Sequence, residues 1–398
     1  MLYSVLKNIK FKGTLEIVDY NNKSHVFGNS GPLVKIKFTS NSIETKLFRN
    51  PGLYLGEGYM NEEILIEEGT IEQFIDIITS SYDDFLNQNR FYKYYENISS
   101  FFKPLHQINE IINSKKNISH HYDLKEDLYR LFLDKDMQYS CAYFSKGNES
   151  LEKAQKDKKR HIASKLLLEP GLKALDIGSG WGGMAMYLAE TEQIDVKGIT
   201  LSEEQCEVSK ARLKEIKRKD HVHFCVQDYR EETQVYDRIV SVGMFEHVGK
   251  RNYKEFFQNI ERILAKDGIM LLHTIGRLNA PSPINPFIRK YIFPGADLPS
   301  LSEVMRVIEP LGLYVTDIEI LRLHYAETLR QWRARFVKRW DDALRIYDER
   351  FCRMWELYLA LCETGFRYHQ LVVFQLQISN RFDILPWTRD YIFKMEEK

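Results

Sequence analysis

The chain has 398 residues, 44% of them hydrophobic, so it is long enough for two or three domains with a sizeable core. Its 56 basic residues balance its 56 acidic residues, which gives no sign of a nucleic-acid-binding protein. We expect no secretory signal, and no transmembrane helix, because no apolar stretch reaches the roughly 18 residues that a span needs. The five cysteines show no C-x-x-C spacing, which predicts reduced thiols in a cytoplasmic protein and no metal site.

Residues 1–105 are expected to form a small α+β domain. Residues 13–20 and 33–38 have strand patterns, and residues 71–78 place their apolar side chains on one helix face. A polar, aromatic bridge at residues 106–150 then leads into the active site. The main domain is expected at residues 151–398.

Strand and helix patterns alternate in the first half of the main domain. Five strands are predicted, at residues 173–177, 196–200, 222–226, 238–242 and 269–274. This alternation predicts a doubly wound α/β fold with a parallel, Rossmann-like sheet.

Two unusual segments follow this sheet. Residues 277–300 hold five of the eleven prolines, and they follow a strand end, where such sheets bind ligands. We expect a wall or lid of the substrate site there, with an ordinary surface loop as the alternative. Residues 326–367 are predicted to be helical, and their many aromatic side chains indicate either core or a long apolar pocket.

A glycine-rich loop follows the first strand of the main domain. Asp176 and the glycines at 178, 180 and 182 match D-x-G-x-G-x-G, the pattern of S-adenosylmethionine (SAM) methyltransferases. The glycines at 178, 180 and 183 also match the weaker dinucleotide pattern, but a dinucleotide site needs an acid where the next strand ends at Thr200. The loop therefore favours SAM, and a turn that only packs a helix on a strand is the remaining alternative.

Polar residues also stand at the ends of the later strands. Ser202 and Gln205 suit a ribose or methionine group, although the pair also makes a helix capping box. Asp228 follows the third strand, where an adenine would lie. Glu246 follows the fourth strand and faces the methyl donor, whereas His273, inside the fifth strand, is by itself more typical of a hydrogen-bonded core residue.

Together these motifs resemble the cyclopropane-fatty-acyl-phospholipid synthases. The matching segments run in order from about residue 115 to residue 380 and are His121-Tyr122-Asp123, 137–144, 175–183, 200–205, 245–249, 272–276, 293–300, 324–326, and 354–355 ahead of Cys362. The N-terminal domain, most clearly residues 56–60, resembles the small domain of bacterial members. The resemblance implies a class I SAM methyltransferase domain with helical additions for the lipid.

The resemblance also implies a reaction and its residues. The methyl group of SAM would be added to a cis double bond of a phospholipid acyl chain, and a bound bicarbonate would take the proton whose loss closes a cyclopropane ring. The implied catalytic residues are Cys141, Glu246, His273, Ile275 (through its backbone), Tyr325 and Cys362. We expect Cys362 to pack beside the ligands, because the reaction needs no covalent enzyme intermediate. The implied SAM contacts are Tyr139, Ser140, Leu175, Asp176, Ile177, Gly178, Ser179, Gly180, Trp181, Gly182, Gly183, Thr200, Leu201, Ser202, Glu203, Glu204, Gln205, Gln227 and Asp228.

The implied partner is a phospholipid bilayer with unsaturated acyl chains, approached from the cytoplasmic side by a peripherally associated enzyme. Residues 287–293 combine basic and apolar side chains and are the favoured membrane contact. The basic cluster at 153–160 is the second candidate, with a solvated helix face as its alternative. The family also suggests a homodimer. The rival functions are alkene methylation without ring closure, N-methylation of a small amine, and non-catalytic lipid binding on the same fold.

Overall fold

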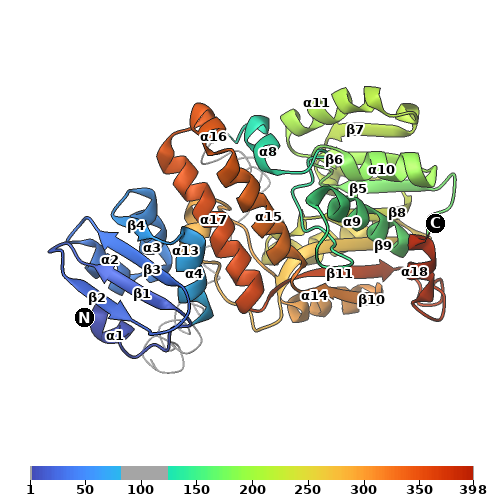
Figure 1. Cartoon of the computed structure of the whole chain (residues 1–398). Coiled ribbons are helices and arrows are strands. Elements are labelled where there is room, and N and C mark those ends of the chain that lie inside the picture. The colour runs from blue at the N-terminus through green and yellow to red at the C-terminus, as the bar shows by residue number, and fades with distance from the viewer. Residues whose placement is uncertain (1, 82–123, 398) are drawn as a thin grey trace.

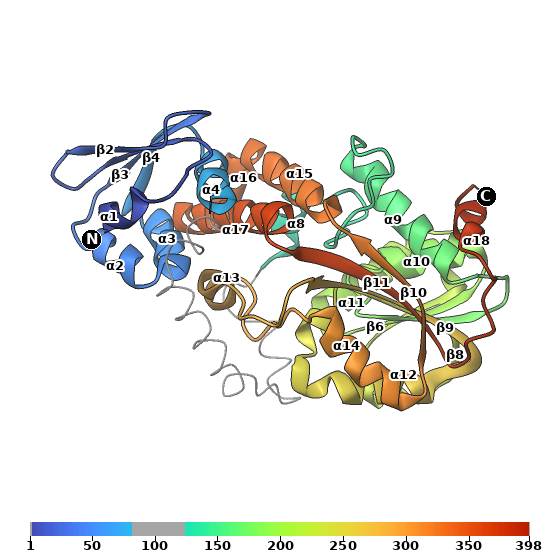
Figure 2. The ribbon, with the colours of Figure 1, turned by 90° about the horizontal axis from the view of Figure 1, so that it is seen from below.

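The computed structural model describes residues 2–81 and 124–397 of the chain (Figures 1 and 2). It confirms the predicted fold class, because a Rossmann-like sheet with helices on both faces is joined to a small N-terminal α+β unit. The predicted boundary between residues 105 and 106 and the His121-Tyr122-Asp123 motif lie outside the described residues. The predicted domain bounds therefore stay predictions.

The N-terminal unit contains a four-stranded sheet in the order β2-β1-β3-β4. Its elements are α1 (Leu2–Leu6), β1 (Thr14–Val18), β2 (Ser24–Phe27), β3 (Leu33–Phe38), α2 (Ile43–Arg49), α3 (Pro51–Met60), β4 (Ile64–Glu68) and α4 (Ile71–Ser80). The two predicted strands and the predicted helix are confirmed as β1, β3 and α4. A capping box between Thr70 and Gln73 closes the N-terminus of α4.

Seven strands form the main sheet, in the order β10-β11-β9-β8-β5-β6-β7. The five predicted strands are β5 (Lys173–Ile177), β6 (Asp195–Thr200), β7 (Val222–Val226), β8 (Tyr236–Val242) and β9 (Leu264–Arg277), and neighbours among them are parallel. β10 (Tyr314–Leu321) and β11 (Leu371–Ser379) extend the sheet beyond β9, and β11 is antiparallel to both of its neighbours. Because the strand order reverses beside β5, a crevice for a ligand is expected at the carboxyl ends of the strands.

Helices cover both faces of this sheet (Figure 2). α9 (Leu151–Lys165) and α10 (Gly183–Glu192) bury Ile162 and Leu188 in the same cluster as Leu271 of β9. α12 (Tyr253–Ile263) and α14 (Leu301–Ile308) bury Phe256 and Val304 with Leu272 of the same strand. Leu271 and Leu272 join different layers because side chains alternate between the faces of a strand.

Three further helices stand between the N-terminal unit and the sheet (Figure 1). They are α15 (His324–Lys338), α16 (Trp340–Ile346) and α17 (Glu349–Tyr368), while α8 (Glu126–Phe132) packs on α15 and α16. Trp332 and Phe336 are fully buried in a core that also includes residues of the N-terminal unit. The Tyr59 hydroxyl of α3 donates to Glu356 of α17 at 2.9 Å. The aromatic helices are therefore mainly core, and they attach the N-terminal unit.

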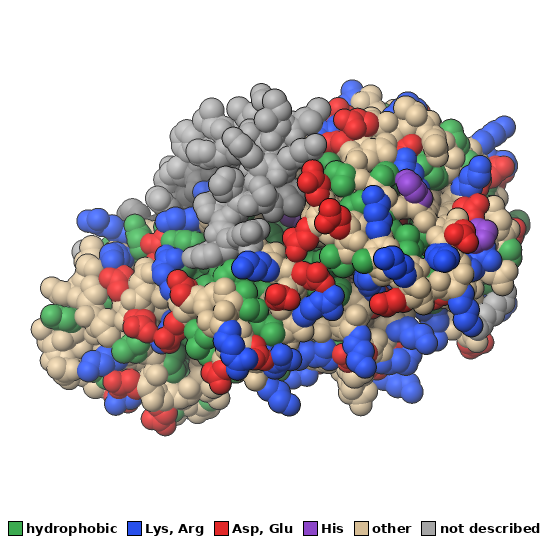
Figure 3. Space-filling model, turned by 90° about the horizontal axis from the view of Figure 1, so that it is seen from above, with side chains coloured by type: hydrophobic (Ala, Val, Ile, Leu, Met, Phe, Trp, Pro, Cys, Tyr) green, Lys and Arg blue, Asp and Glu red, His purple; other side chains and the backbone are tan. Residues whose placement is uncertain are grey.

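The two predicted membrane contacts are each exposed only in part, and both stay predictions. Lys158 is completely buried, and Lys159 is 9% exposed and forms an ion pair with Asp136. Only part of the basic cluster at 153–160 therefore faces solvent. In α13 (Pro286–Tyr291), Phe287 and Ile288 are buried rather than facing solvent, since the Phe287 ring fits against Gly56 of α3. Basic and acidic side chains are interspersed over the face shown in Figure 3. Within the described residues, no helix is both long and apolar enough to cross a membrane.

Candidate active site

The glycine loop joins β5 to α10 through three glycines with positive φ. Gly178, Gly180 and Gly182 have φ values of 79°, 53° and 82°, in the left-handed region that favours glycine. A Cβ atom would lie 2.7 Å from the Met244 Cβ at the first position and 2.6 Å from the Phe224 Cζ at the third. At Gly180 it would meet nothing within 4 Å. The loop is therefore tightly packed at its flanking glycines and open at Gly180.

Asp176, the residue before the last of β5, is buried, and one of its carboxyl oxygens forms no hydrogen bond within the described residues. Its Oδ2 atom has no hydrogen-bond partner among the described residues, and the same is true of the Ser179 hydroxyl. Burial raises the pKa of Asp176 to about 7, although the Lys158 ammonium opposes the shift. A carboxyl group of this kind suits a ligand that carries positive charge, and SAM is such a ligand.

The ends of β6 and β7 supply polar groups to the same crevice. Ser202 caps α11 (Glu203–Arg212) by accepting from the Gln205 N–H at 3.2 Å, and the Thr200 hydroxyl donates to the Gln205 side chain at 3.0 Å. Capping and ligand contact coexist here, because all three residues also line the cavity. Asp228 accepts two hydrogen bonds from the Arg230 guanidinium, at 2.9 and 2.6 Å. The carboxylate predicted beside an adenine is therefore already paired with a cation.

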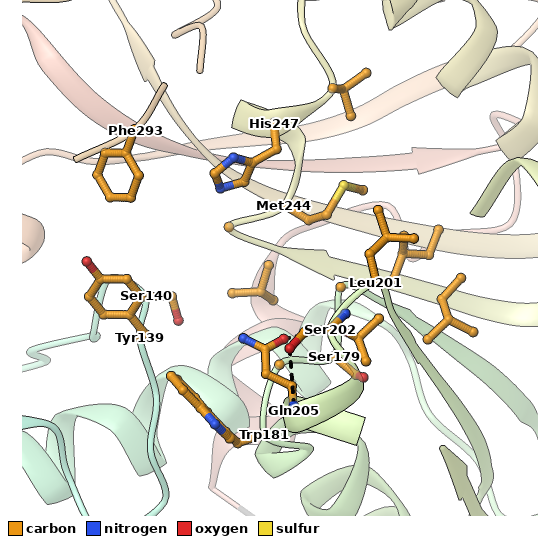
Figure 4. Close-up of a pocket in the computed structure, with 18 of the residues that line it drawn as sticks. Tyr139, Ser140, Ser179, Trp181, Leu201, Ser202, Gln205, Met244, His247 and Phe293 are labelled. Carbon is orange, nitrogen blue, oxygen red and sulfur yellow. Dashed lines mark hydrogen bonds between the residues drawn. The ribbon is translucent and has the colours of Figure 1, made fainter. Parts of the chain in front are cut away.

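These groups line one cavity of about 320 Å³ at the carboxyl ends of the strands (Figure 4). In Figure 4, Tyr139, Trp181 and Gln205 lie across the cavity from His247 and Phe293. The predicted SAM-contacting residues that line it are Tyr139, Ser140, Asp176, Ile177, Gly178, Ser179, Gly180, Trp181, Thr200, Leu201, Ser202, Gln205, Gln227 and Asp228. Four segments that are distant in sequence thus meet at one cavity.

The other predicted SAM contacts, Leu175, Gly182, Gly183, Glu203 and Glu204, do not line this cavity. Leu175 is buried in the core, and a Cβ at Gly183 would lie 2.3 Å from the Gln138 side chain. Glu204 accepts from the backbone N–H of Glu126 at 3.3 Å. These residues therefore have structural roles. Leu175 and Gly183 pack around the glycine loop, and Glu204 belongs to α11; the residues that line the cavity lie next to them in sequence.

Glu246 lies four residues beyond the end of β8, in a short helical turn (Phe245–His247), and is 5% exposed. Its Oε1 accepts the backbone N–H of Ile275 at 2.5 Å, whereas its Oε2 is buried without a hydrogen-bond partner. Burial raises the pKa of Glu246 to about 7, against the hydrogen bond from the Ile275 N–H. This carboxyl group therefore gains and loses a proton near neutral pH.

His273 precedes Ile275 by two residues in β9, so both side chains point to the α9 face of the sheet. Its Nδ1 lies 3.1 Å from the Gln375 side-chain nitrogen, and its Nε2 is buried without a partner. Burial lowers the pKa of His273 far below its usual value, and the Lys158 and Lys165 ammonium groups lower it further. His273 is therefore a neutral imidazole.

Tyr325, in the first turn of α15, lies among the other predicted catalytic groups. Burial raises the pKa of its hydroxyl well above the usual value, and Tyr139, Cys141, Cys362 and Glu246 raise it further through their proximity. The hydroxyl therefore stays protonated and can donate a hydrogen bond.

The two predicted active-site cysteines are protonated thiols. Cys141 is 1% exposed, and burial raises its pKa. Burial also raises the pKa of Cys362 to about 12. Since the thiolate is the nucleophilic form of cysteine, neither residue is poised for covalent chemistry. This agrees with the packing role expected for Cys362.

Several cavity residues have no counterpart among the predicted site residues. Five examples are Gln138, Met244, His247, Phe293 and Trp355. Four of them belong to segments that carry the family resemblance, so motif membership was an available signal. Met244 lies outside those segments, and its place follows from its packing against Gly178, which only the folded chain reveals.

The comparisons with known proteins agree with this geometry. Residues 109–376 match the family described as mycolic acid cyclopropane synthetase, and residues 1–90 match a domain of unknown function. The chain is 42% identical over 259 residues to the cyclopropane-fatty-acyl-phospholipid synthase of Escherichia coli strain K12. That alignment covers 65% of this chain and 66% of the synthase, just under two thirds of its length.

Two further relatives extend the comparison. The chain is 33% identical over 347 residues to the tuberculostearic acid methyltransferase UfaA1 of Mycobacterium tuberculosis, covering 84% of this chain and 80% of that protein. The solved structure of mycolic acid cyclopropane synthase CmaA1 complexed with SAH and CTAB matches with a TM-score of 0.63 at 34% identity, over 66% of this chain and 97% of that one. Because the matched family region spans more than half of the sequence, this chain belongs to the mycolic acid cyclopropane synthetase family of SAM-dependent methyltransferases.

Proposed function

We propose that this enzyme transfers the methyl group of SAM to a cis double bond of a phospholipid acyl chain and closes a cyclopropane ring, with bicarbonate bound beside the reacting carbons. Similarity to a synthase named for this product supports the substrate and the reaction. The observation that carries the proposal is the buried Glu246 carboxyl, which accepts from the Ile275 N–H at 2.5 Å and lies near enough to Tyr325 to raise the pKa of its hydroxyl. Glu246 is flanked in sequence by Met244 and His247, which both line that cavity.

When bound, SAM supplies an electrophilic methyl group on a positively charged sulfur. The residues present fit this ligand, because the loop backbone is open at Gly180 and Asp176 has a buried oxygen without a partner. Positive charge beside Asp176 would lower its pKa from about 7 and hold it as a carboxylate. An alkene is a weak nucleophile, so the main task of the loop is to hold the methyl group close and in line.

Aromatic side chains suit the acyl chain. Tyr139, Phe293 and Trp355 line the cavity, and the Tyr139 and Tyr358 hydroxyls are hydrogen-bonded at 2.8 Å. Such rings contact a hydrocarbon chain favourably, and their faces attract the positive charge that develops on the alkene carbons. They also keep out water, which would otherwise capture that charge.

Bicarbonate, when bound, would supply the base for the proton that leaves the added methyl group. Glu246, His273 and Tyr325 would hold it, since the Glu246 Oε2 and His273 Nε2 atoms are buried without partners and the Tyr325 hydroxyl is protonated. With a pKa of about 7, Glu246 can share a proton with such an anion. The Ile275 N–H positions the Glu246 carboxyl, and Cys141 closes the site as a neutral thiol.

We also propose that the substrate is reached at the cytoplasmic face of a phospholipid bilayer. The phospholipid in the name of the E. coli relative supports this, as do the five free thiols, which suit a reducing compartment. The homodimer suggested by the family stays a prediction.

Methylation without ring closure is the second candidate. Its support is the match to the tuberculostearic acid methyltransferase, which extends over 84% of this chain against 65% for the synthase. The two candidates share the SAM cavity and the substrate class, and they differ in whether the product keeps a double bond.

The deciding experiment incubates the purified protein with SAM and vesicles of a cis-monounsaturated phospholipid. Mass spectrometry then weighs the acyl chains before and after ozonolysis. Cyclopropanation adds one CH2 unit and makes the chain resistant to ozone, whereas methylation without ring closure leaves a cleavable double bond. An unchanged acyl mass would contradict both candidates and favour a lipid-binding protein.

A further inference from the structure

A row of three polar side chains crosses the sheet beneath α9. Glu319 of β10 pairs in register with Gln375 of β11, and Gln375 pairs in register with His273 of β9. Residues paired in this way point to the same face of a sheet. Lys165, the last residue of α9, contacts this row and is completely buried, as is Gln375.

The row is connected by hydrogen bonds that end at His273. The Lys165 Nζ donates to the Gln375 Oε1 at 2.8 Å and also to the Glu319 carboxylate. The Gln375 Nε2 lies 3.1 Å from the His273 Nδ1. The His273 Nε2, at the far side of the ring, is the atom without a partner.

The chemistry of Lys165 sets the direction of each of these hydrogen bonds. An ammonium group has three donors and no acceptor, so Gln375 must present its amide oxygen to Lys165. The Glu319 carboxylate opposes the effect of burial on Lys165 and so favours its charged form. The Gln375 NH2 group then faces His273 and donates to its Nδ1. A neutral imidazole that accepts at Nδ1 carries its proton at Nε2.

We propose that Lys165 and Gln375 are positioning residues that hold His273 as the neutral tautomer with its proton on Nε2. In this form His273 offers an N–H donor to an anion and does not serve as the base. This role rests on the bicarbonate site proposed above, whereas the tautomer itself exists whether or not the protein has that activity. At metal sites, residues that do not touch the metal themselves commonly orient a ligating histidine in this way.

The test replaces Gln375 by glutamate and reads the His273 tautomer directly. Long-range proton–nitrogen NMR correlation on protein with 15N-labelled histidine distinguishes the two ring nitrogens, and a His273→Asn variant assigns the signal. The wild type is expected to carry the proton on Nε2. In Gln375→Glu, the new carboxylate keeps the Lys165 contact but can only accept from the ring, so the proton moves to Nδ1. In the vesicle assay, kcat should fall about 10–100-fold with an unchanged KM for SAM, a loss typical of removing an orienting partner.

Gln377→Glu is the matched control on the same strand and face. Gln377 is 1% exposed and donates to the Lys165 carbonyl at 2.5 Å, but it does not contact His273. This variant should lose stability while His273 keeps its proton on Nε2 and kcat stays within a fewfold of wild type. A wild-type proton on Nδ1, or an unchanged tautomer in folded Gln375→Glu, would overturn the proposal. If Gln375→Glu does not fold, the wild-type tautomer still decides. A protein with the Nε2 tautomer but no cyclopropane product would refute the proposed function alone.

Discussion

Replacing Glu246 by glutamine is expected to stabilise the protein at alkaline pH while removing its activity. Burial raises the pKa of Glu246 from 4.5 to about 7. The folded protein therefore binds more protons than the unfolded chain between these values, so stability is lost as the pH rises through this window. Each pKa unit corresponds to about 1.4 kcal/mol, so the ionised carboxyl costs about 3 kcal/mol at pH 8. Glutamine retains the oxygen that accepts from Ile275 and never ionises.

The assay is thermal unfolding of wild type and Glu246→Gln at pH 5 and pH 8, without SAM and bicarbonate. At pH 8 the variant should melt roughly 6–12 °C higher, on the usual relation between free energy and Tm for a domain of this size. At pH 5 the difference should shrink to roughly a quarter of its value at pH 8, because the folded Glu246 is then protonated and only the unfolded chain is partly ionised. Glu232→Gln is the control of opposite sign, since Glu232 pairs with Lys197 at 2.6 Å and that contact helps to lower its pKa. If Glu246→Gln raised the Tm equally at both pH values, or did not raise it at pH 8, the reasoning would be refuted.

Four further variants test separate parts of the site. Gly182→Ala should lower the Tm by several degrees, because its Cβ would lie 2.6 Å from the Phe224 ring. Gly180→Ala, whose Cβ would meet nothing within 4 Å, should fold but bind S-adenosylhomocysteine at least tenfold more weakly in calorimetry. Tyr325→Phe should lower kcat by about 100-fold with an unchanged Kd for that ligand, since the lost group is a single donor to the proposed anion; an equal loss of binding would place Tyr325 at the SAM site instead. Cys362→Ala should keep at least a tenth of the wild-type rate, because its pKa of about 12 leaves it a thiol, and a fall to background would show that it is a nucleophile.

The sequence predicts the five central strands well, because each is a short apolar run between turn and helix patterns. It also predicts the cavity segments that carry dense motifs, such as the glycine loop before α10. β10 and β11 escape prediction for a physical reason. β11 buries the polar side chains of Gln375 and Gln377, and β10 holds the half-buried Glu319, so the usual apolar alternation is lost.

The burial of two lysines in α9 could not be predicted from the sequence either. Lys158 and Lys165 have the spacing of a solvated basic face, yet both are completely buried. Their partners, such as Ser140 and Gln375, come from segments that no local pattern links to α9. Burial of a charge depends on such distant partners, so only the folded chain reveals it.

The central claim is that a methyl group is added and then loses a proton as the ring closes. The most direct measurement supplies SAM with a fully deuterated methyl group to the protein and cis-monounsaturated phospholipid vesicles, and weighs the ozone-resistant acyl product. Cyclopropanation predicts a product that keeps all but one of the methyl deuterium atoms. A product that keeps every deuterium atom, or the absence of any labelled acyl chain, would contradict the account.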